Sequence, residues 1–172
     1  MRKTKILLVL LAAGLLFLPL NISSASRGLD AAIQLLPATT PGWTFTGEQI
    51  RSSLGYSWMP AGDVNGDRFD DLIVSAYAYD SATFTNAGRV YFFTGSDTGL
   101  DPSSPDWIID GEQIDAWLGY SVAGAGDVNG DGYDDVLIGS PGYDLAAPET
   151  SNVGRAYLYL GSASGLLLTP DW

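Results

Sequence analysis

The sequence contains an internal repeat with an offset of about 64 residues, because residues 41–80 align with residues 105–144 without a gap. The segment 61–67 recurs unchanged as 125–131, and the similarity resumes beyond residue 144 after a short insertion. A repeat of this length is typical of folds that stack copies of one supersecondary unit, since a single copy cannot bury its own apolar surface. The chain is therefore predicted to be a repeat protein.

Each repeat is predicted to contain four short strands bounded by turn residues. In the second repeat these strands are expected at residues 107–110, 120–125, 135–140 and 156–160. The third and fourth runs are continuously apolar or aromatic, as in strands that are buried on both faces. Four-stranded units with glycine and aromatic residues at fixed places are typical of propeller blades. The sequence therefore predicts an all-β fold of four-stranded blades of the β-propeller type.

The two repeats are predicted to form part of an incomplete propeller. They occupy residues 41–104 and 105–168, and residues 169–172 match the opening of a third copy. Because propellers usually have at least four blades, two blades do not close a ring. We therefore expect an N-terminal fragment of a longer protein, whose further repeats would be partners of the two present here.

The N-terminus has the pattern of a secretory signal peptide. Basic residues at 2–5 precede an apolar run at 6–20, and small residues follow at 23–25. The apolar run is shorter than the ~20 residues that a membrane-spanning helix needs, although an uncleaved anchor is the alternative. We predict a signal peptide over residues 1–25 and a linker over 26–40, so that the remaining chain is secreted or displayed at the cell surface.

The composition excludes several classes of active site. With no His and no Cys, the chain cannot form a Ser-His-Asp triad, a thiol nucleophile or a disulfide. The 20 acidic residues outnumber the 8 basic ones, and no Lys follows Lys5. The formal charge of −12 disfavours nucleic acid and anionic membrane surfaces and favours a cation. We expect no nucleic-acid partner and no membrane contact beyond the N-terminal segment.

A nine-residue acidic loop lies between the second and third predicted strands of each repeat. Oxygen atoms at loop positions 1, 3, 5 and 9, with the backbone carbonyl of position 7, can surround a hard cation. Calcium accepts about 6 to 8 oxygen ligands in flexible geometry, so two calcium sites are predicted. The candidate ligands are Asp63, Asn65, Asp67, Phe69 and Asp71 in the first loop, and Asp127, Asn129, Asp131, Tyr133 and Asp135 in the second.

Two other interpretations of these loops compete with calcium. Asn-Gly and Asp-Gly pairs form tight turns by themselves, so the first alternative is a solvated acidic loop without metal. Crowded carboxylates would repel one another without a counterion, at the same register in both repeats, which favours the metal. The second alternative is an EF-hand loop, which ends on a carboxylate at position 12, whereas position 12 here is Val74 or Ile138 in an apolar run.

The second predicted site is expected to bind calcium more strongly than the first. Loop position 6, where a glycine eases the turn, is Gly132 in the second loop but Arg68 in the first. Arg68 brings a Cβ atom and a positive charge towards the ion, so the first site is expected to be weaker.

Several motifs resemble those of the FG-GAP repeat, the unit of the integrin α-subunit β-propeller and of many bacterial exported proteins. Leu54-Gly55 and Leu118-Gly119 stand where the family has Phe-Gly. The family's calcium loop, Asp-x-Asn-x-Asp-Gly-x-x-Asp, matches fully from Asp127 and at all but the glycine from Asp63. The resemblance implies a seven-bladed propeller with calcium loops on one face and ligand contacts on the opposite face.

The expected function is that of an exported, calcium-binding, non-catalytic module for adhesion or for binding an extracellular protein or carbohydrate. The alternative is the propeller part of an extracellular hydrolase or lyase that acts on polysaccharide through a carboxylate pair, for which Glu112 and Asp115 are the acids to test. A structural spacer in a surface protein is a third interpretation. Because fold does not determine function, the step from propeller to adhesion is an analogy.

By the same analogy, four loops would form the ligand face. They lie at residues 49–53, 81–86, 113–117 and 145–153. Phe84 and Trp117 are the loop aromatics to test first, although loop aromatics are more often buried against a neighbouring blade.

The remaining aromatic and basic residues that recur are assigned structural roles. Trp43 and Trp107, each at the start of a strand, are predicted core residues. Arg89 and Arg155, the basic residues common to both repeats, are predicted to pair with nearby acids rather than with a ligand.

Overall fold

A computed structural model describes residues 42–145, 152–167 and 169–171. Within these ranges the chain forms strands, turns and loops, and it contains no helix with the length and hydropathy of a membrane span. The predicted signal peptide and linker lie outside the described residues. The strands are β1 (Leu54–Gly62), β2 (Asp71–Ala76), β3 (Arg89–Phe93), β4 (Trp107–Asp110), β5 (Ser121–Gly126), β6 (Asp135–Ser140) and β7 (Arg155–Tyr159).

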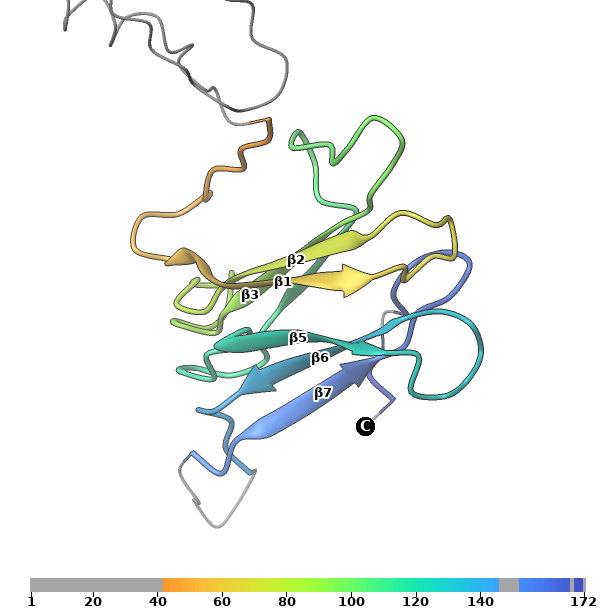
Figure 1. Cartoon of the computed structure of the whole chain (residues 1–172). Coiled ribbons are helices and arrows are strands. Elements are labelled where there is room, and N and C mark those ends of the chain that lie inside the picture. The colour runs from red at the N-terminus through yellow and green to blue at the C-terminus, as the bar shows by residue number, and fades with distance from the viewer. Residues whose placement is uncertain (1–41, 146–151, 168, 172) are drawn as a thin grey trace, which may run out of the picture. The chain divides into compact units, whose positions relative to one another are not determined.

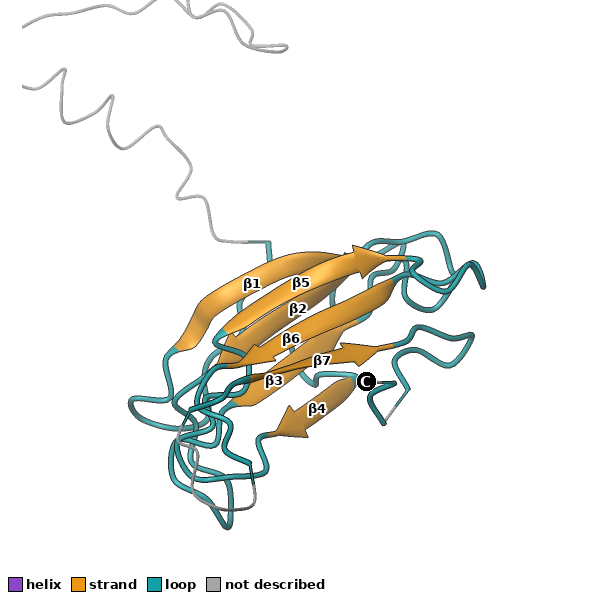
Figure 2. Ribbon diagram, turned by 90° about the horizontal axis from the view of Figure 1, so that it is seen from below, coloured by secondary structure: helices purple, strands orange, loops and turns teal. Residues whose placement is uncertain are grey.

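The strands form two antiparallel sheets, which confirms the predicted all-β fold. The first sheet has the order β1-β2-β3-β4 and the second the order β5-β6-β7. Within each sheet, every strand pairs with the next one along the chain, as expected when short connections join neighbours. The two sheets pack against each other with β1 next to β5, an arrangement that matches two consecutive propeller blades (Figures 1 and 2).

The boundary between the sheets differs from the boundary between the sequence repeats. The predicted opening strand of the second repeat is β4, which pairs with β3 of the first sheet through Trp107 and Phe92. The same arrangement starts again in the second sheet, because the Asp171 N–H donates to the Leu158 carbonyl at 2.9 Å, as the Asp106 N–H does to the Phe92 carbonyl. A sequence repeat gives the length of the repeating unit but does not show where one blade ends and the next begins. Hydrogen bonding of β4 to the free edge of β3 places β4 in the first sheet.

The first strand of each sheet ends in a bulge that leads into the acidic loop. The register slips before Gly62 pairs with Asp71, and again before Gly126 pairs with Asp135. Gly62 and Gly126 have φ values of 82° and 69°. Glycine adopts this left-handed conformation without a steric penalty, so the chain leaves the sheet at the same point in both repeats.

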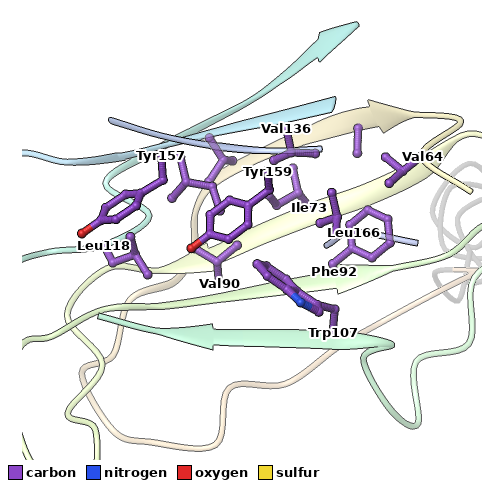
Figure 3. Packing of buried hydrophobic residues seen from close by; sticks show 13 residues of the cluster. Val64, Ile73, Val90, Phe92, Trp107, Leu118, Val136, Tyr157, Tyr159 and Leu166 are labelled. Carbon is purple, nitrogen blue, oxygen red and sulfur yellow. The ribbon is translucent and has the colours of Figure 1, made fainter. Parts of the chain in front are cut away.

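The main hydrophobic core lies between the two sheets (Figure 3). Ile73 and Phe92 contribute from the first sheet and Val136 and Tyr159 from the second, and all four are at most 1% exposed. Trp107 bridges the sheets, because its ring meets that of Tyr159 edge-on with centroids 5.1 Å apart. Burial of each such side chain contributes about 1.5–3 kcal/mol, so this layer holds the two sheets together.

A second cluster covers the opposite face of the first sheet. It is built from residues of β2 and β3, including Phe93, with Trp43 packed against it. The Trp43 ring meets Phe93 edge-on at a centroid distance of 5.1 Å, as Trp107 meets Tyr159. The predicted core role of the two tryptophans is confirmed, with Trp107 buried and Trp43 partly buried.

The first of the two recurrent arginines pairs with acids, as predicted. Arg89 donates to both carboxylate oxygens of Asp110 at 2.5 and 2.7 Å and to Glu48 at 2.9 Å. Its guanidinium also lies 3.9 Å from the centre of the Tyr79 ring. Arg155 lies over the Tyr143 ring at 3.6 Å, and the described part of the chain shows no ion pair for it.

Candidate metal loops and ligand face

The acidic loops connect β1 to β2 and β5 to β6, and their first residue organises the turn. In the second loop, Asp127 Oδ1 accepts hydrogen bonds from the N–H groups of Gly130 at 2.7 Å and Asp131 at 3.0 Å. Asp127 Oδ2 accepts one from the Gly132 N–H at 2.9 Å. The carboxylate at position 1 therefore points into the turn, because the loop's own backbone donors surround it.

The side chains at positions 3 and 5 converge on the same region. Asn129 Oδ1 accepts from the Asp131 N–H at 3.0 Å, and Asn129 Nδ2 donates to Asp131 Oδ2 at 2.8 Å. Asp131 Oδ1 in turn accepts from the Tyr133 N–H at 3.0 Å. The structure thus brings together side-chain oxygens of positions 1 and 3 around one backbone N–H, with the position 5 carboxylate beside them.

The first loop repeats this geometry. The Asp67 N–H donates to Asp63 Oδ1 and to Asn65 Oδ1, each at 2.9 Å, and Asn65 Nδ2 donates to Asp67 Oδ2 at 2.9 Å. The two loops therefore have one conformation at positions 1, 3 and 5. At position 6, however, Arg68 has a φ of 77°, where Gly132 has 95°. A residue with a side chain is strained in this conformation, which supports the expectation of a weaker first site.

The acid at position 9 lies inside the protein in both loops. Asp71 and Asp135 are 2% and 0% exposed. Asp135 accepts hydrogen bonds from the N–H groups of Val128 at 2.8 Å and Gly161 at 2.9 Å. These carboxylates connect the start of the acidic loop to the turn after the third strand of the sheet, which is β3 for Asp71 and β7 for Asp135. This role was not predicted, although an acid at the start of an apolar strand is a sequence signal for it.

The pKa of the acid at position 9 also depends on the other charges of its loop. Burial raises the pKa of Asp71 to about 6, while hydrogen bonds from the backbone N–H groups of Gly95 and Val64 act in the opposite direction. The negative charges of Asp67 and Asp63 raise this pKa further. The carboxylates of the loop therefore lie close enough to repel one another, and a cation would remove that repulsion.

Three tyrosines, two of them exposed, form a cluster at the other end of the sheets. Tyr56 lies at the start of β1, Tyr120 just before β5 and Tyr77 just after β2, whereas the acidic loops follow the ends of β1 and β5. Their ring centroids are 4.5 to 5.3 Å apart. Tyr56 is 51% exposed and Tyr120 is 42% exposed. The cluster was not predicted, although Tyr56 and Tyr120 occupy the same place in the two repeats.

The segments that contain the two acidic loops also match a known family. The FG-GAP repeat matches the chain at residues 55–93 and 118–159. The chain therefore contains two FG-GAP repeats. Each matched segment includes three strands of one sheet, so an FG-GAP repeat corresponds to most of one blade in this structure.

The FG-GAP repeats are similar to those of integrin α subunits. Integrin alpha-PS2 of Drosophila melanogaster is 36% identical over 134 residues, which is 75% of this chain and 9% of that protein. Integrin alpha-3 of Mus musculus is 32% identical, with 73% of this chain and 11% of that protein covered. Integrin alpha-6 of Homo sapiens is 31% identical, with 76% and 10% covered. The chain spans about a tenth of the length of these curated relatives.

The FG-GAP loops fit a hard divalent cation by the chemistry of their donors. Each loop offers oxygen donors from three side chains that already converge, and calcium prefers such ligands. In the described residues, no group of three or more Asp or Glu side chains is placed closely enough to hold an ion directly. The carboxylate oxygens instead accept backbone N–H groups, so ion binding requires that they turn from these donors towards the ion.

The predicted ligand-face loops of the FG-GAP repeats lie at the same end as the tyrosine cluster, and hydrogen bonds hold them in place. Gln49 Oε1 accepts from the Asp80 N–H at 2.7 Å, and Gln113 Oε1 accepts from the Asp144 N–H at 2.9 Å. These pairs explain why the same glutamine recurs in both repeats. Residues 146–151 of the last predicted loop lie outside the described residues.

The two loop aromatics singled out from the sequence are partly buried. The Phe84 N–H donates to Ser81 Oγ at 3.0 Å within a tight turn. The Trp117 N–H donates to the Asn86 carbonyl at 3.2 Å, which links the second repeat to a loop of the first. Both aromatics are less exposed than Tyr56, so the tyrosine cluster presents the larger aromatic surface at this end.

Proposed function

We propose that this chain is part of an exported, non-catalytic binding module of the adhesion type, which is stabilised by calcium at its FG-GAP loops. The observation that supports it most is that the two ends of the sheets carry different kinds of side chain. Oxygen donors converge at one end in both repeats, and exposed aromatic side chains gather at the other. Export is inferred from the signal-like N-terminal segment.

Further FG-GAP repeats are the first proposed partners. Ile73 of β2 is 0% exposed because the second sheet covers it, whereas its counterpart Leu137 of β6 is 42% exposed. When an apolar side chain is buried in one repeat and its counterpart is exposed in the next, the exposed face is one that a further blade would cover. We therefore propose that a following repeat packs on the β6 face, as the second sheet packs on β2.

The proposed calcium ligands are the ten residues identified from the sequence. Asp127, Asn129 and Asp131 would hold the ion through side-chain oxygens, Tyr133 through its carbonyl, and Asp135 from its buried position. The first loop would act in the same way, with less affinity because of the strain at Arg68. When bound, calcium supplies positive charge that offsets the repulsion among these carboxylates. Sites of the extracellular type bind calcium at about 10⁻⁴ to 10⁻³ M.

Calcium binding should appear as added thermal stability that depends on Asp131. At a free calcium concentration about 100-fold above the dissociation constant, one site contributes about 2.7 kcal/mol. Asp131→Ala is expected to lower the melting temperature in calcium but not in a chelator, because it removes one ligand. Thermal denaturation of the full chain in both buffers measures this.

The matching change in the first loop serves as the control. Asp67→Ala is expected to lower the melting temperature in calcium by less than Asp131→Ala does, since the first site is proposed to be weaker. If Asp131→Ala melts like the parent in both buffers, the second loop is not a metal site.

The second proposed partner is an extracellular protein or carbohydrate that binds at the tyrosine end. Tyrosine offers apolar area and a hydroxyl group at little cost in conformational entropy, so exposed tyrosines are suited to recognition. We expect Tyr56→Ala combined with Tyr120→Ala to weaken ligand binding at least about tenfold, which corresponds to 1.4 kcal/mol. Arrays of extracellular-matrix proteins and glycans are used to identify a ligand of the full chain. Binding of the parent and of the variant to that ligand is then measured.

A change at the opposite end tests whether the loss is specific. Val128 is 53% exposed at the acidic-loop end and is not a proposed calcium ligand, so Val128→Ala serves as the control. We expect this variant to bind as the parent does. Equal binding by the parent and the tyrosine variant would refute the assignment of the ligand face.

Among the described residues, no observation favours the alternative of a hydrolase or lyase. Asp115, one of the two acids considered for catalysis, accepts a hydrogen bond from Asn86 Nδ2 at 2.7 Å. This contact joins the two repeats and gives Asp115 a structural role.

A further inference from the structure

The two acidic loops contact each other through Asp134, which is not itself a proposed metal ligand. Asp134, at position 8 of the second loop, accepts a hydrogen bond on Oδ2 from the Asp63 N–H at 2.8 Å. In return, the Asp134 N–H donates to the Asp63 carbonyl at 3.1 Å. Asp63 is position 1 of the first loop, so one residue of the second loop holds the backbone of a proposed ligand in the first.

Close packing surrounds this pair of hydrogen bonds. A Cβ atom added at Gly62 would collide with the Asp134 carboxylate, and one added at Gly66 would lie 2.7 Å from the Tyr133 ring. The counterparts Gly126 and Gly130 in the second loop have open space at the same place. Positions 7 and 8 of the second loop therefore fit against the first loop at two glycines, which leaves little freedom between the loops.

We propose that Asp134 is a positioning residue that couples the two loops, so that order in the second loop raises the ion affinity of the first. This proposal rests on the proposed calcium function. Asp134 lies between the proposed ligands Tyr133 and Asp135, so loading the second loop fixes the position of Asp134. The carboxylate of Asp134 then fixes the backbone of Asp63, and the first loop loses less conformational freedom when it binds its own ion. By reciprocity, the first loop favours the second to the same extent.

Site-specific calcium titration of the full chain tests the coupling. The amide signals of Gly66 and Gly130, at position 4 of each loop, report the two loops separately in two-dimensional NMR spectra. We expect Asp134→Ala to raise the calcium concentration at half-saturation of Gly66 about fivefold, at the lower end of typical coupling factors. The midpoint of Gly130 is expected to shift much less, because the second site, proposed to be the stronger one, fills before the first site is occupied and so gains little from the coupling.

Two further variants separate positioning from charge and from general effects on the fold. Asp134→Asn keeps an acceptor oxygen and is expected to restore the Gly66 midpoint close to that of the parent. Asp70 occupies position 8 of the first loop and is exposed, so Asp70→Ala is expected to change neither midpoint. An unchanged Gly66 midpoint in Asp134→Ala, or an equal shift in Asp134→Asn or Asp70→Ala, would overturn the proposal.

A metal-free measurement distinguishes this proposal from the calcium function itself. If neither Gly66 nor Gly130 responds to calcium in the parent, the calcium function fails, and the positioning role is judged in chelator by hydrogen exchange. The Asp63 amide is expected to exchange faster in Asp134→Ala than in the parent and at the parent's rate in Asp70→Ala. An Asp63 amide that exchanges equally fast in the parent and in Asp134→Ala would refute the positioning role without reference to metal.

Discussion

Trp107→Ala is expected to lower the free energy of unfolding by about 3–5 kcal/mol, the usual cost of removing a large aromatic side chain from a core. Trp107 is 9% exposed, lies on β4 of the first sheet and packs edge-on against Tyr159 of the second. Its removal would open a cavity between the sheets, because the surrounding backbone is held by strand pairing and cannot collapse into the space. Denaturant unfolding of the full chain in chelator measures the loss without a contribution from calcium.

Two comparisons make this result specific. Trp43→Ala is expected to cost less, since Trp43 is only partly buried although it makes the equivalent contact with Phe93. Trp107→Phe is also expected to cost less than Trp107→Ala, because the indole Nε1 of Trp107 has no hydrogen-bond partner to lose among the described residues. A cost below about 1 kcal/mol for Trp107→Ala would mean that β4 does not join the two sheets, since full core truncations cost more than this.

Asp135→Ala is expected to lower the free energy of unfolding by about 3 kcal/mol in chelator, and by more in calcium, because a proposed calcium ligand is lost as well. Asp135 is 0% exposed, and its carboxylate accepts hydrogen bonds from the N–H groups of Val128 and Gly161. The substitution leaves two buried donors without partners, and each unsatisfied group costs about 1–3 kcal/mol. The backbone of the loop would then lose its anchor to the turn after β7.

The same denaturation experiment in calcium and in chelator separates the two roles of Asp135. Asp135→Asn keeps one acceptor oxygen and is expected to lose less stability than Asp135→Ala in both buffers. The contrast with Asp131→Ala is the informative one, because that variant is expected to lose stability in calcium alone. If Asp135→Ala were as stable as the parent in chelator, the buried carboxylate would be a metal ligand only and not a structural anchor.

The sequence was sufficient to predict most of the local structure of each repeat. A period of about 64 residues, apolar runs and turn residues at fixed places predicted the all-β fold and the strands β1 to β7, but the strand expected to start at Trp43 is absent from the described residues. The acidic loops were placed between the correct strands, whereas the role of Asp127, Asn129 and Asp131 as metal ligands stays a prediction. These features depend on neighbours within a few residues, which a sequence pattern records directly.

Only the tertiary structure decided how the repeats meet. The sequence could not show that β4 completes the preceding sheet or that Tyr56 and Tyr120 gather at one end. It also could not show that Asp135 anchors two distant backbone groups, or that Asp134 reaches across to Asp63. Each of these features joins residues that are distant in sequence, often in different repeats, and such contacts are set by strand pairing and by the packing of one sheet on the next. The local sequence pattern therefore determined the strands and loops of each blade, and long-range packing determined how the blades contact each other.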